Sequence, residues 1–190
     1  MRGTGAQHRS DVLEVATRLF YERGIRAVGM DTIVKEANVG NATVYRRFPS
    51  KDALATAFVQ GCADSWFERM EQATDQVPDP RTKILTVFTA LAEDAASPSY
   101  RGCPMLNTST EFRDGEHPAH IVAVNHKAQV RDWFRSLAGE AGADDPERLA
   151  DELLIVLNGA YSTTTVLDRE VFGRRASALA ARLVDEACDR

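Results

Sequence analysis

The sequence predicts an all-α protein, and three observations support this fold class. Apolar residues recur three and four positions apart along most of the chain, which gives a helix one buried face. Runs that alternate apolar and polar residues, as a half-buried strand does, are few. The prolines Pro98, Pro104, Pro118 and Pro146 fall where loops or first helical turns are expected, and both tolerate proline. With 190 residues, the chain is long enough to bury a core without cross-links.

The N-terminal part is predicted to form four helices, over 10–23, 30–37, 41–47 and 51–75. Ser10 can cap the first of them, and Gly24 can end it. Asn38 tolerates the left-handed backbone that a tight turn between the second and third helices needs. Pro49 breaks the chain before the fourth helix, and Ser50 can cap that helix. Its apolar residues recur every four positions, at Leu54, Phe58, Cys62, Trp66 and Met70.

The remaining residues predict five further helices, over 81–96, 105–112, 119–140, 146–168 and 173–188. The segment VPDPR, residues 77–81, is the clearest break before them. Apolar and small residues of the last two helices could form a four-helix contact with a second copy. These are Leu153, Val156, Leu157, Ala160, Thr164, Ala176, Leu179, Ala180, Leu183, Val184 and Ala187. Packing within one chain is the alternative for this surface.

Residues 38–48 contain no acidic side chain and read NVGNATVYRRF. Two short helices joined by a tight turn form a helix-turn-helix, whose second helix can enter the major groove of DNA. At about 100° per residue, Val44 and Phe48 face inward. Ala42, Thr43, Tyr45 and Arg46 face outward, and Asn41 and Arg47 flank the inward face. The third predicted helix therefore presents a polar and basic face.

This outward face suits a nucleic acid. Ala42 could meet a thymine methyl group, and Arg46 could bridge guanine O6 and N7. Phosphate oxygens could be contacted by the hydroxyls of Thr43 and Tyr45 and by the cations Arg47 and Lys51. The backbone amides at the start of the fourth helix could add to these contacts. The alternative is a solvated amphipathic helix with Tyr45 half-buried and its arginines paired to surface acids.

Charge is unevenly distributed along the chain. Residues 1–60 carry nine basic and six acidic side chains, whereas residues 61–190 carry fourteen basic and twenty-two acidic ones. A basic first part attached to an acidic remainder suggests that a polyanion binds the first part alone.

Four short patterns follow one another over residues 12–54. They are Ala16-x-x-Leu19-Phe20-x-x-x-Gly24, Ile33-x-x-x-Ala37, Val39-x-x-x-Thr43-x-Tyr45-x-x-Phe48 and Ser50-Lys51-x-x-Leu54. In this order and spacing the stretch resembles the N-terminal domain of TetR/AcrR-family transcriptional regulators. The resemblance implies a three-helix helix-turn-helix DNA-binding domain over 1–50, followed by a helical ligand-binding and dimerisation domain over 51–190. It also implies a homodimer formed through the last two helices.

The resemblance assigns roles within the third helix and the start of the fourth. Matched positions imply that Thr43, Tyr45, Arg47 and Lys51 contact the DNA backbone, and that Asn41, Ala42 and Arg46 help to select sequence. Two positions depart from the family pattern. Asn38 stands where the turn usually has Gly, and Gly40 stands where many members have a Ser or Thr that caps the helix and binds phosphate. One hydroxyl contact is therefore expected to be missing.

Large apolar residues and a few polar ones in the second domain are candidates for an effector pocket. The candidate ligand-binding residues are Trp66, Met70, Phe88, Met105, Asn107, Glu111, His126, Trp133 and Tyr161, with Asn158 and Thr164 as further polar anchors. For any one apolar residue, ordinary core packing is the alternative. Residues 100–118 resemble a motif of some TetR-type second domains, but that motif specifies no single ligand.

Metal binding and redox chemistry are not expected. The acidic and histidine side chains between Glu111 and His126 lack the compact spacing of a zinc site, and helix capping or surface exposure explains them. Cys103 has only Arg101 as a basic neighbour and no second cysteine close in sequence, which favours packing over redox sensing. No cofactor is expected.

The expected function is a ligand-responsive repressor that binds a near-palindromic operator as a homodimer. A small, largely apolar effector would release it. A helix-turn-helix activator, or a helical adaptor whose first domain binds protein, are the alternatives. An enzyme is not expected, because the sequence has no Gly-rich phosphate loop and no nucleophile elbow. An odd number of cysteines, no apolar leader at the start and no run long enough to span a bilayer predict a cytoplasmic protein without membrane partners.

Overall fold

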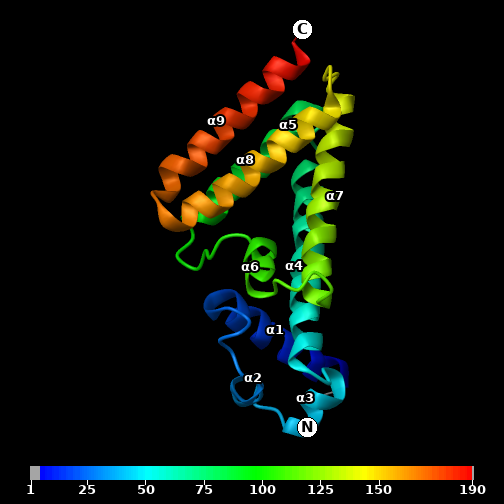
Figure 1. Cartoon of the computed structure of the whole chain (residues 1–190), viewed down its shortest axis with the longest axis vertical. Helices are drawn as coiled ribbons and strands as arrows, with labels where there is room; N and C mark the ends of the chain where they lie inside the picture. The colour runs from blue at the N-terminus through cyan, green and yellow to red at the C-terminus, as the bar shows by residue number, and fades with distance from the viewer. Residues whose placement is uncertain (1–4, 190) are drawn as a thin grey trace. The chain divides into compact units, whose positions relative to one another are not determined.

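The computed structural model describes residues 5–189, with side chains from Val12 onward, and this part of the chain is all helix and loop. The prediction of an all-α fold is confirmed (Figure 1). The helices are α1 (Gly5–Arg23), α2 (Met30–Glu36), α3 (Asn41–Arg47), α4 (Lys51–Thr74), α5 (Pro80–Ala96), α6 (Pro104–Glu111), α7 (Pro118–Glu140), α8 (Pro146–Val166) and α9 (Arg169–Cys188).

The helices group into two compact units. The first, called here the N-terminal unit, comprises Met1–Asp64 and Pro104–Val124, and the second, the C-terminal unit, comprises Ser65–Cys103 and Asn125–Arg190. Helices α4 and α7 therefore contribute residues to both units, and α6 belongs with the first three helices. A division into domains at residue 50 remains a proposal.

Short polar caps set where several helices begin. Ser50 Oγ accepts a hydrogen bond from the Ala53 amide at 3.0 Å, which confirms the predicted cap of α4. Asp79 and Asp145 accept from Thr82 and Arg148 in the same way, at 2.8 and 3.0 Å, ahead of the prolines that start α5 and α8.

The first and last helices begin earlier than predicted. Helix α1 begins at Gly5, so Ser10, whose side chain is not described, lies inside the helix and does not precede it. Helix α9 begins at Arg169 and not at Gly173, because Asp168 accepts from the Val171 amide at 2.9 Å. Gly173 instead allows α9 to approach α5, since a Cβ there would lie 3.2 Å from that of Ala92.

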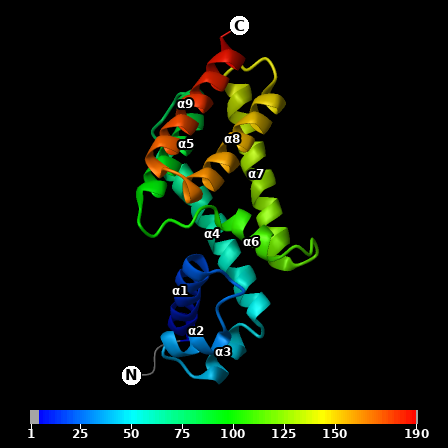
Figure 2. The same cartoon turned by 60° about the vertical axis from the view of Figure 1, so that its left-hand side comes forward.

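The N-terminal unit has an apolar core shared by α1, α2, α3 and the first half of α4 (Figures 1 and 2). Phe20 and Phe58 meet edge to face there, with ring centroids 5.6 Å apart. The other large buried side chains of this core are Leu19, Ile25, Val28, Ile33, Val44, Phe48 and Leu54. The predicted inward residues Val44 and Phe48 of α3, and Leu54 and Phe58 of the predicted α4 stripe, are therefore buried.

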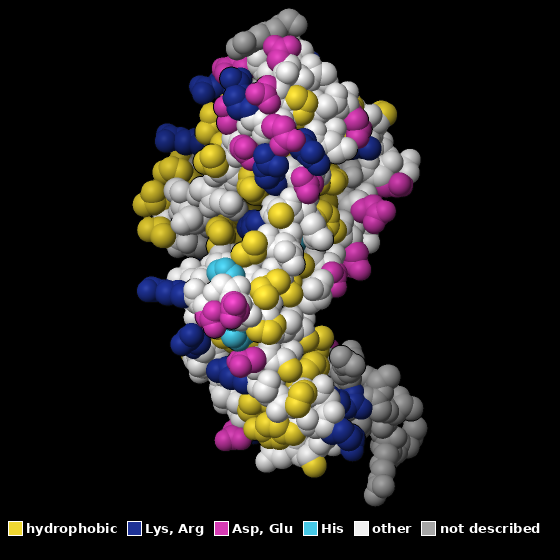
Figure 3. Space-filling model, turned by 45° about the vertical axis from the view of Figure 1, so that its right-hand side comes forward, with side chains coloured by type: hydrophobic (Ala, Val, Ile, Leu, Met, Phe, Trp, Pro, Cys, Tyr) yellow, Lys and Arg dark blue, Asp and Glu magenta, His cyan; other side chains and the backbone are white. Residues whose placement is uncertain are grey.

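In the C-terminal unit, α5, α8 and α9 lie side by side (Figure 2). Phe88 of α5 and Phe134 of α7 stack, with centroids 6.1 Å apart, and both are fully buried. Basic and acidic side chains alternate on the face of this unit that Figure 3 shows. Among the ion pairs of this unit, the Arg131 guanidinium lies 2.5 Å from Asp151 and 2.8 Å from Glu147.

The face of α8 that was predicted to meet a second copy is buried within the single chain. Leu153, Leu157, Ala160 and Thr164 are at most 6% exposed. These four residues therefore pack inside the protomer, whereas Val156 of the same stripe is partly exposed, and the dimer through the last two helices remains a prediction. Within the described residues, none of the helices is both long and apolar enough to cross a membrane.

Candidate nucleic-acid interface and neighbouring sites

The turn between α2 and α3 depends on Asn38, which tolerates a left-handed backbone, and on Gly40, which has no side chain. Asn38 has φ of 52°, the left-handed conformation that the sequence predicted for it. Gly40 is the N-cap of α3, and its carbonyl accepts from the amides of Thr43 and Val44 at 2.8 and 3.2 Å. No side chain caps α3, as expected from glycine at this position.

Helix α3 divides into a buried and an exposed face. Val44 and Phe48 are at most 2% exposed, whereas Tyr45 is 46% exposed. Asn41, Ala42 and Arg46 are also exposed, and Thr43 and Arg47 are partly exposed. The helical wheel drawn from the sequence therefore places these side chains correctly, although their contact with DNA remains a prediction.

The cations near this face have no carboxylate partner among the described residues. Neither Arg46 nor Arg47 forms an ion pair there, and the Nε of Arg47 is buried without a hydrogen-bond partner. Lys51 is partly exposed, and its Nζ donates to the backbone carbonyl of Arg26 at 3.1 Å. The alternative in which surface acids neutralise these arginines is therefore not favoured.

The backbone that follows α1 is held by a residue distant in sequence. The two carboxylate oxygens of Glu111 accept from the amides of Ile25 at 2.9 Å and Arg26 at 2.6 Å. Arg26 Nε donates in return to the Glu111 carbonyl at 2.7 Å. Gly24, with φ of +88°, lies against this carboxylate, and a Cβ there would come within 3.3 Å of it. Glu111 was predicted as a polar anchor for a ligand. Both of its carboxylate oxygens already accept hydrogen bonds from backbone amides of the same unit.

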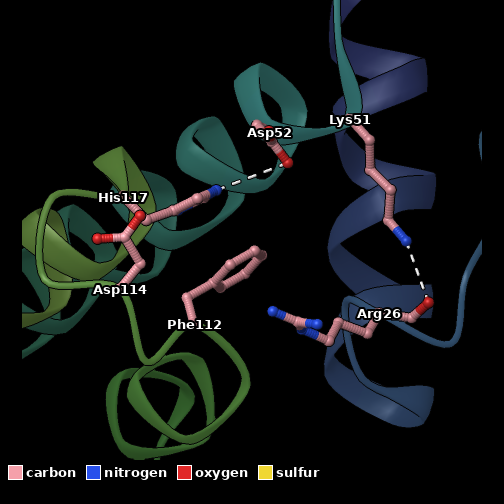
Figure 4. Close-up of a pocket in the computed structure, with 6 residues that line it drawn as sticks. All are labelled: Arg26, Lys51, Asp52, Phe112, Asp114 and His117. Carbon is pink, nitrogen blue, oxygen red and sulfur yellow. Dashed lines mark hydrogen bonds and ion pairs between the residues drawn. The ribbon is translucent and has the colours of Figure 1, made fainter.

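A pocket of about 350 Å³ lies beside this contact, within the N-terminal unit (Figure 4). The ring of Phe112 stacks on His117, with centroids 3.9 Å apart, and the Arg26 guanidinium carbon lies 5.5 Å from the Phe112 centroid. His117 Nε2 faces Asp52 at 3.6 Å. The sequence predicted a DNA-backbone contact for Lys51 and gave no sign that Lys51 lies with these residues.

Four of the nine predicted ligand-binding residues meet in the C-terminal unit. The ring of Trp66 lies edge-on to His126 and Trp133, with centroids 5.4 and 6.1 Å away. Tyr161 lies beside Trp66, and burial raises the pKa of its hydroxyl above the usual value. The cluster combines large rings with a few polar groups, as small-molecule sites do.

The other predicted ligand-binding residues are placed elsewhere. Met70 and Phe88 are buried side chains of the C-terminal unit, at most 1% exposed. Met105, Asn107 and Glu111 belong to the N-terminal unit. The residues predicted to form one effector pocket are therefore divided between the two units.

Two polar contacts flank the aromatic cluster. Lys127 Nζ donates to Asn158 Oδ1 at 2.7 Å and lies 5.4 Å from the Tyr161 ring centroid. Tyr100 and Thr164 join hydroxyl to hydroxyl at 2.9 Å. Asn158 and Thr164 were predicted as polar anchors, whereas the role of Lys127 has no signal in the sequence, because its partners lie 31 or more positions away.

Several histidines and acids between residues 111 and 126 make local hydrogen bonds. His120 Nδ1 bonds the Phe112 carbonyl at 2.7 Å, and Asp114 Oδ1 accepts from the Glu116 amide at 3.0 Å. Across the part of the chain that the structure describes, no three His, Cys, Asp or Glu side chains are arranged to hold a metal. Cys103 is a free, buried thiol.

Residues 12–58 match the model of the bacterial regulatory proteins of the tetR family. The HTH-type transcriptional regulator YjdC of Escherichia coli is 27% identical over 161 residues, which is 83% of each chain. A solved TetR-family regulator from Streptomyces coelicolor superposes with a TM-score of 0.92 at 27% identity, over 96% of this chain and 97% of that one. A TetR regulator structure from Streptomyces avermitilis gives 0.85 at 30% identity, over 96% and 98%.

Proposed function

Because this chain belongs to the TetR family of bacterial transcriptional regulators, we propose that it represses transcription by binding a near-palindromic operator as a homodimer. A small, largely apolar effector bound in the C-terminal unit would release it from the DNA. As a DNA-binding regulator it would act in the cytoplasm.

The exposed face of α3 carries this proposal. It presents Ala42, Tyr45 and Arg46 toward solvent, and no acidic side chain occurs between residues 38 and 48. A helix of this kind fits the major groove, with Arg46 reading guanine and Tyr45 contacting phosphate. Arg47 and Lys51 would add phosphate contacts at the edge of the same surface.

The aromatic cluster of the C-terminal unit supports an apolar effector. Trp66, Trp133 and His126 offer ring surfaces, and the buried Tyr161 beside them carries a hydroxyl. A ligand that is mainly apolar with one or two hydrogen-bonding groups fits such a lining. Its binding would release the operator if it favours a conformation whose two α3 helices no longer match the groove spacing.

The roles of the two arginines can be separated by binding measurements on DNA fragments selected by the purified protein. Arg46→Ala is expected to weaken binding about tenfold or more and to relax the preference at one base pair. Arg47→Ala is expected to weaken binding to all sequences equally and to reduce the slope of log affinity against log salt by about one.

Tyr45→Ala tests the same face, and Arg113→Ala is the matched control, because Arg113 is exposed and lies in the loop after α6. Fluorescence anisotropy gives the affinity, and circular dichroism checks the fold. Wild-type affinity in both Tyr45→Ala and Arg46→Ala would rule out this face as the interface.

A further inference from the structure

The pocket beside Phe112 has opposite charges on its walls. Arg26 and Lys51 approach it from one side, Asp114 and His117 from the other, and Asp52 lies between them (Figure 4). Among the described residues, neither cation is paired with either carboxylate. Arg26 uses its Nε for the Glu111 carbonyl, and Lys51 donates to the Arg26 carbonyl. The charged groups therefore face a shared space without neutralising one another.

His117 adds a hydrogen-bond donor that lacks an acceptor. Its Nδ1 accepts from the Ala119 amide at 3.2 Å, so the proton of the neutral ring is on Nε2. This Nε2 is buried and has no hydrogen-bond partner, and the 3.6 Å to Asp52 is too long for one. A buried donor without an acceptor is costly, and an acceptor that enters the pocket would remove that cost.

These groups favour a ligand that carries both a positive and a negative charge. A simple anion would meet Arg26 and Lys51 but would be repelled by Asp52 and Asp114, and a simple cation would have the opposite problem. A molecule whose carboxylate and ammonium are close together satisfies both sets. Its carboxylate would accept from Arg26 and Lys51 on one side of the pocket, and its ammonium would donate to Asp52.

We propose that the pocket formed by Arg26, Lys51, Asp52, Phe112, Asp114 and His117 binds a small amino acid in its zwitterionic form. The edge of Phe112 supplies an apolar wall for a short side chain. The site lies wholly within the N-terminal unit and shares no residue with the aromatic cluster around Trp66. It shares Lys51 with the proposed DNA-contacting surface, but amino-acid binding can be measured without DNA.

Matched probes test the need for both charges. L-Alanine is titrated into the full-length protein, with ligand-observed NMR or calorimetry as the readout, and is compared with N-acetyl-L-alanine and L-alaninamide. Each derivative lacks one charge and is expected to bind about tenfold more weakly or worse, because one charge-assisted contact is lost and an opposing charge remains. Equal binding of N-acetyl-L-alanine would show a general anion site and overturn the proposal, as would the absence of L-alanine binding at millimolar concentration.

Isosteric variants locate the site. Asp52→Asn and Lys51→Gln are each expected to weaken L-alanine binding about tenfold. Asp64→Asn is the control. Asp64 is an exposed carboxylate on the same helix, accepts a hydrogen bond from Gln60 and does not line the pocket. Thermal melting checks that each variant is folded, and Asp114→Asn replaces Asp52→Asn if the latter is not. Wild-type affinity in both a folded cation variant and a folded carboxylate variant would place the amino acid elsewhere.

Discussion

At the residue scale, Glu111 determines how the chain leaves α1. Its carboxylate accepts from two successive amides, Ile25 and Arg26, at the point where Gly24 takes a positive φ. These amides follow the end of a helix and are therefore not paired within it. A carboxylate is an acceptor only, so both of its oxygens suit a pair of N–H donors.

Glu111→Gln is expected to lower the free energy of unfolding by about 1–3 kcal/mol, because the amide nitrogen of Gln would face one of these N–H donors. Hydrogen exchange at Ile25 and Arg26 measures the local effect, and both amides should exchange faster. Glu116→Gln, at an exposed carboxylate in the loop before α7, should leave this exchange unchanged. Unaltered exchange in Glu111→Gln would show that these hydrogen bonds do not hold the turn.

Residues close in sequence were predictable, whereas partners far apart were not. The left-handed Asn38, the cap at Ser50 and the buried pair Val44 and Phe48 follow from local pattern, because each depends on neighbours within about one helical turn. Glu111 was expected to bind a ligand, and its partners lie 85 and 86 positions away. No periodicity in a single sequence connects positions so far apart.

At the element scale, α7 and α8 are joined by an exposed ion-pair network. Arg131 of α7 lies between Asp151 and Glu147 of α8, and this guanidinium holds the pKa of Asp151 below its usual value. A carboxyl whose pKa is lowered by folding stabilises the native state above its unfolded pKa. That contribution is lost as the pH falls through the lower, native pKa.

Asp151→Asn is therefore expected to melt at a slightly lower temperature than the wild type at neutral pH. The difference should fade as the pH falls below about 4, where the wild-type carboxyl also becomes neutral. Melting curves at several pH values test this, with Asp132→Asn as a control, because among the described residues this exposed α7 carboxylate pairs with Arg135 of its own helix. A difference that stays constant down to pH 2 would contradict the assignment.

Another feature at this scale is the exposed side of α8, where two large apolar residues have no covering contact among the described residues. Ile155 and Val166 are 70% and 79% exposed, and they share one side of the helix with Gly159 and Ser162. The sequence did point to α8 for self-association, but its stripe Leu153, Leu157 and Thr164 is the buried one. Both sides of α8 carry apolar residues at helical spacing, so periodicity alone could not tell which side is internal.

Ile155→Glu is expected to shift the proposed homodimer toward monomer, because a buried unpaired carboxylate would replace an apolar contact. Sedimentation velocity over a range of protein concentrations measures this shift. Ile121→Glu is the matched control, since Ile121 is an exposed apolar residue of α7, at 43%. A dimer that persists unchanged in Ile155→Glu, or dissociates equally in both variants, would remove this face of α8 from the interface.

At the scale of the whole molecule, the proposed function assigns different partners to the basic and the acidic parts of the chain. The first 60 residues carry an excess of basic side chains, and the remaining 130 carry an excess of acidic ones. Only the N-terminal part attracts DNA electrostatically, and a single α3 reads only a few base pairs. In the proposed function, a specific operator therefore requires two such helices held together by the homodimer, on half-sites related by its two-fold symmetry.

DNA selected by the purified protein is accordingly expected to contain an inverted repeat. A duplex with one half-site scrambled should bind about a hundredfold more weakly than the intact repeat, because the second contact is then no longer intramolecular. The Ile155→Glu monomer should bind the intact and the half-scrambled duplex with nearly equal affinity, which distinguishes loss of pairing from damage to α3. If the wild type itself binds the two duplexes equally, each N-terminal unit acts alone and the dimeric operator model fails, even where the contacts of Tyr45 and Arg46 hold.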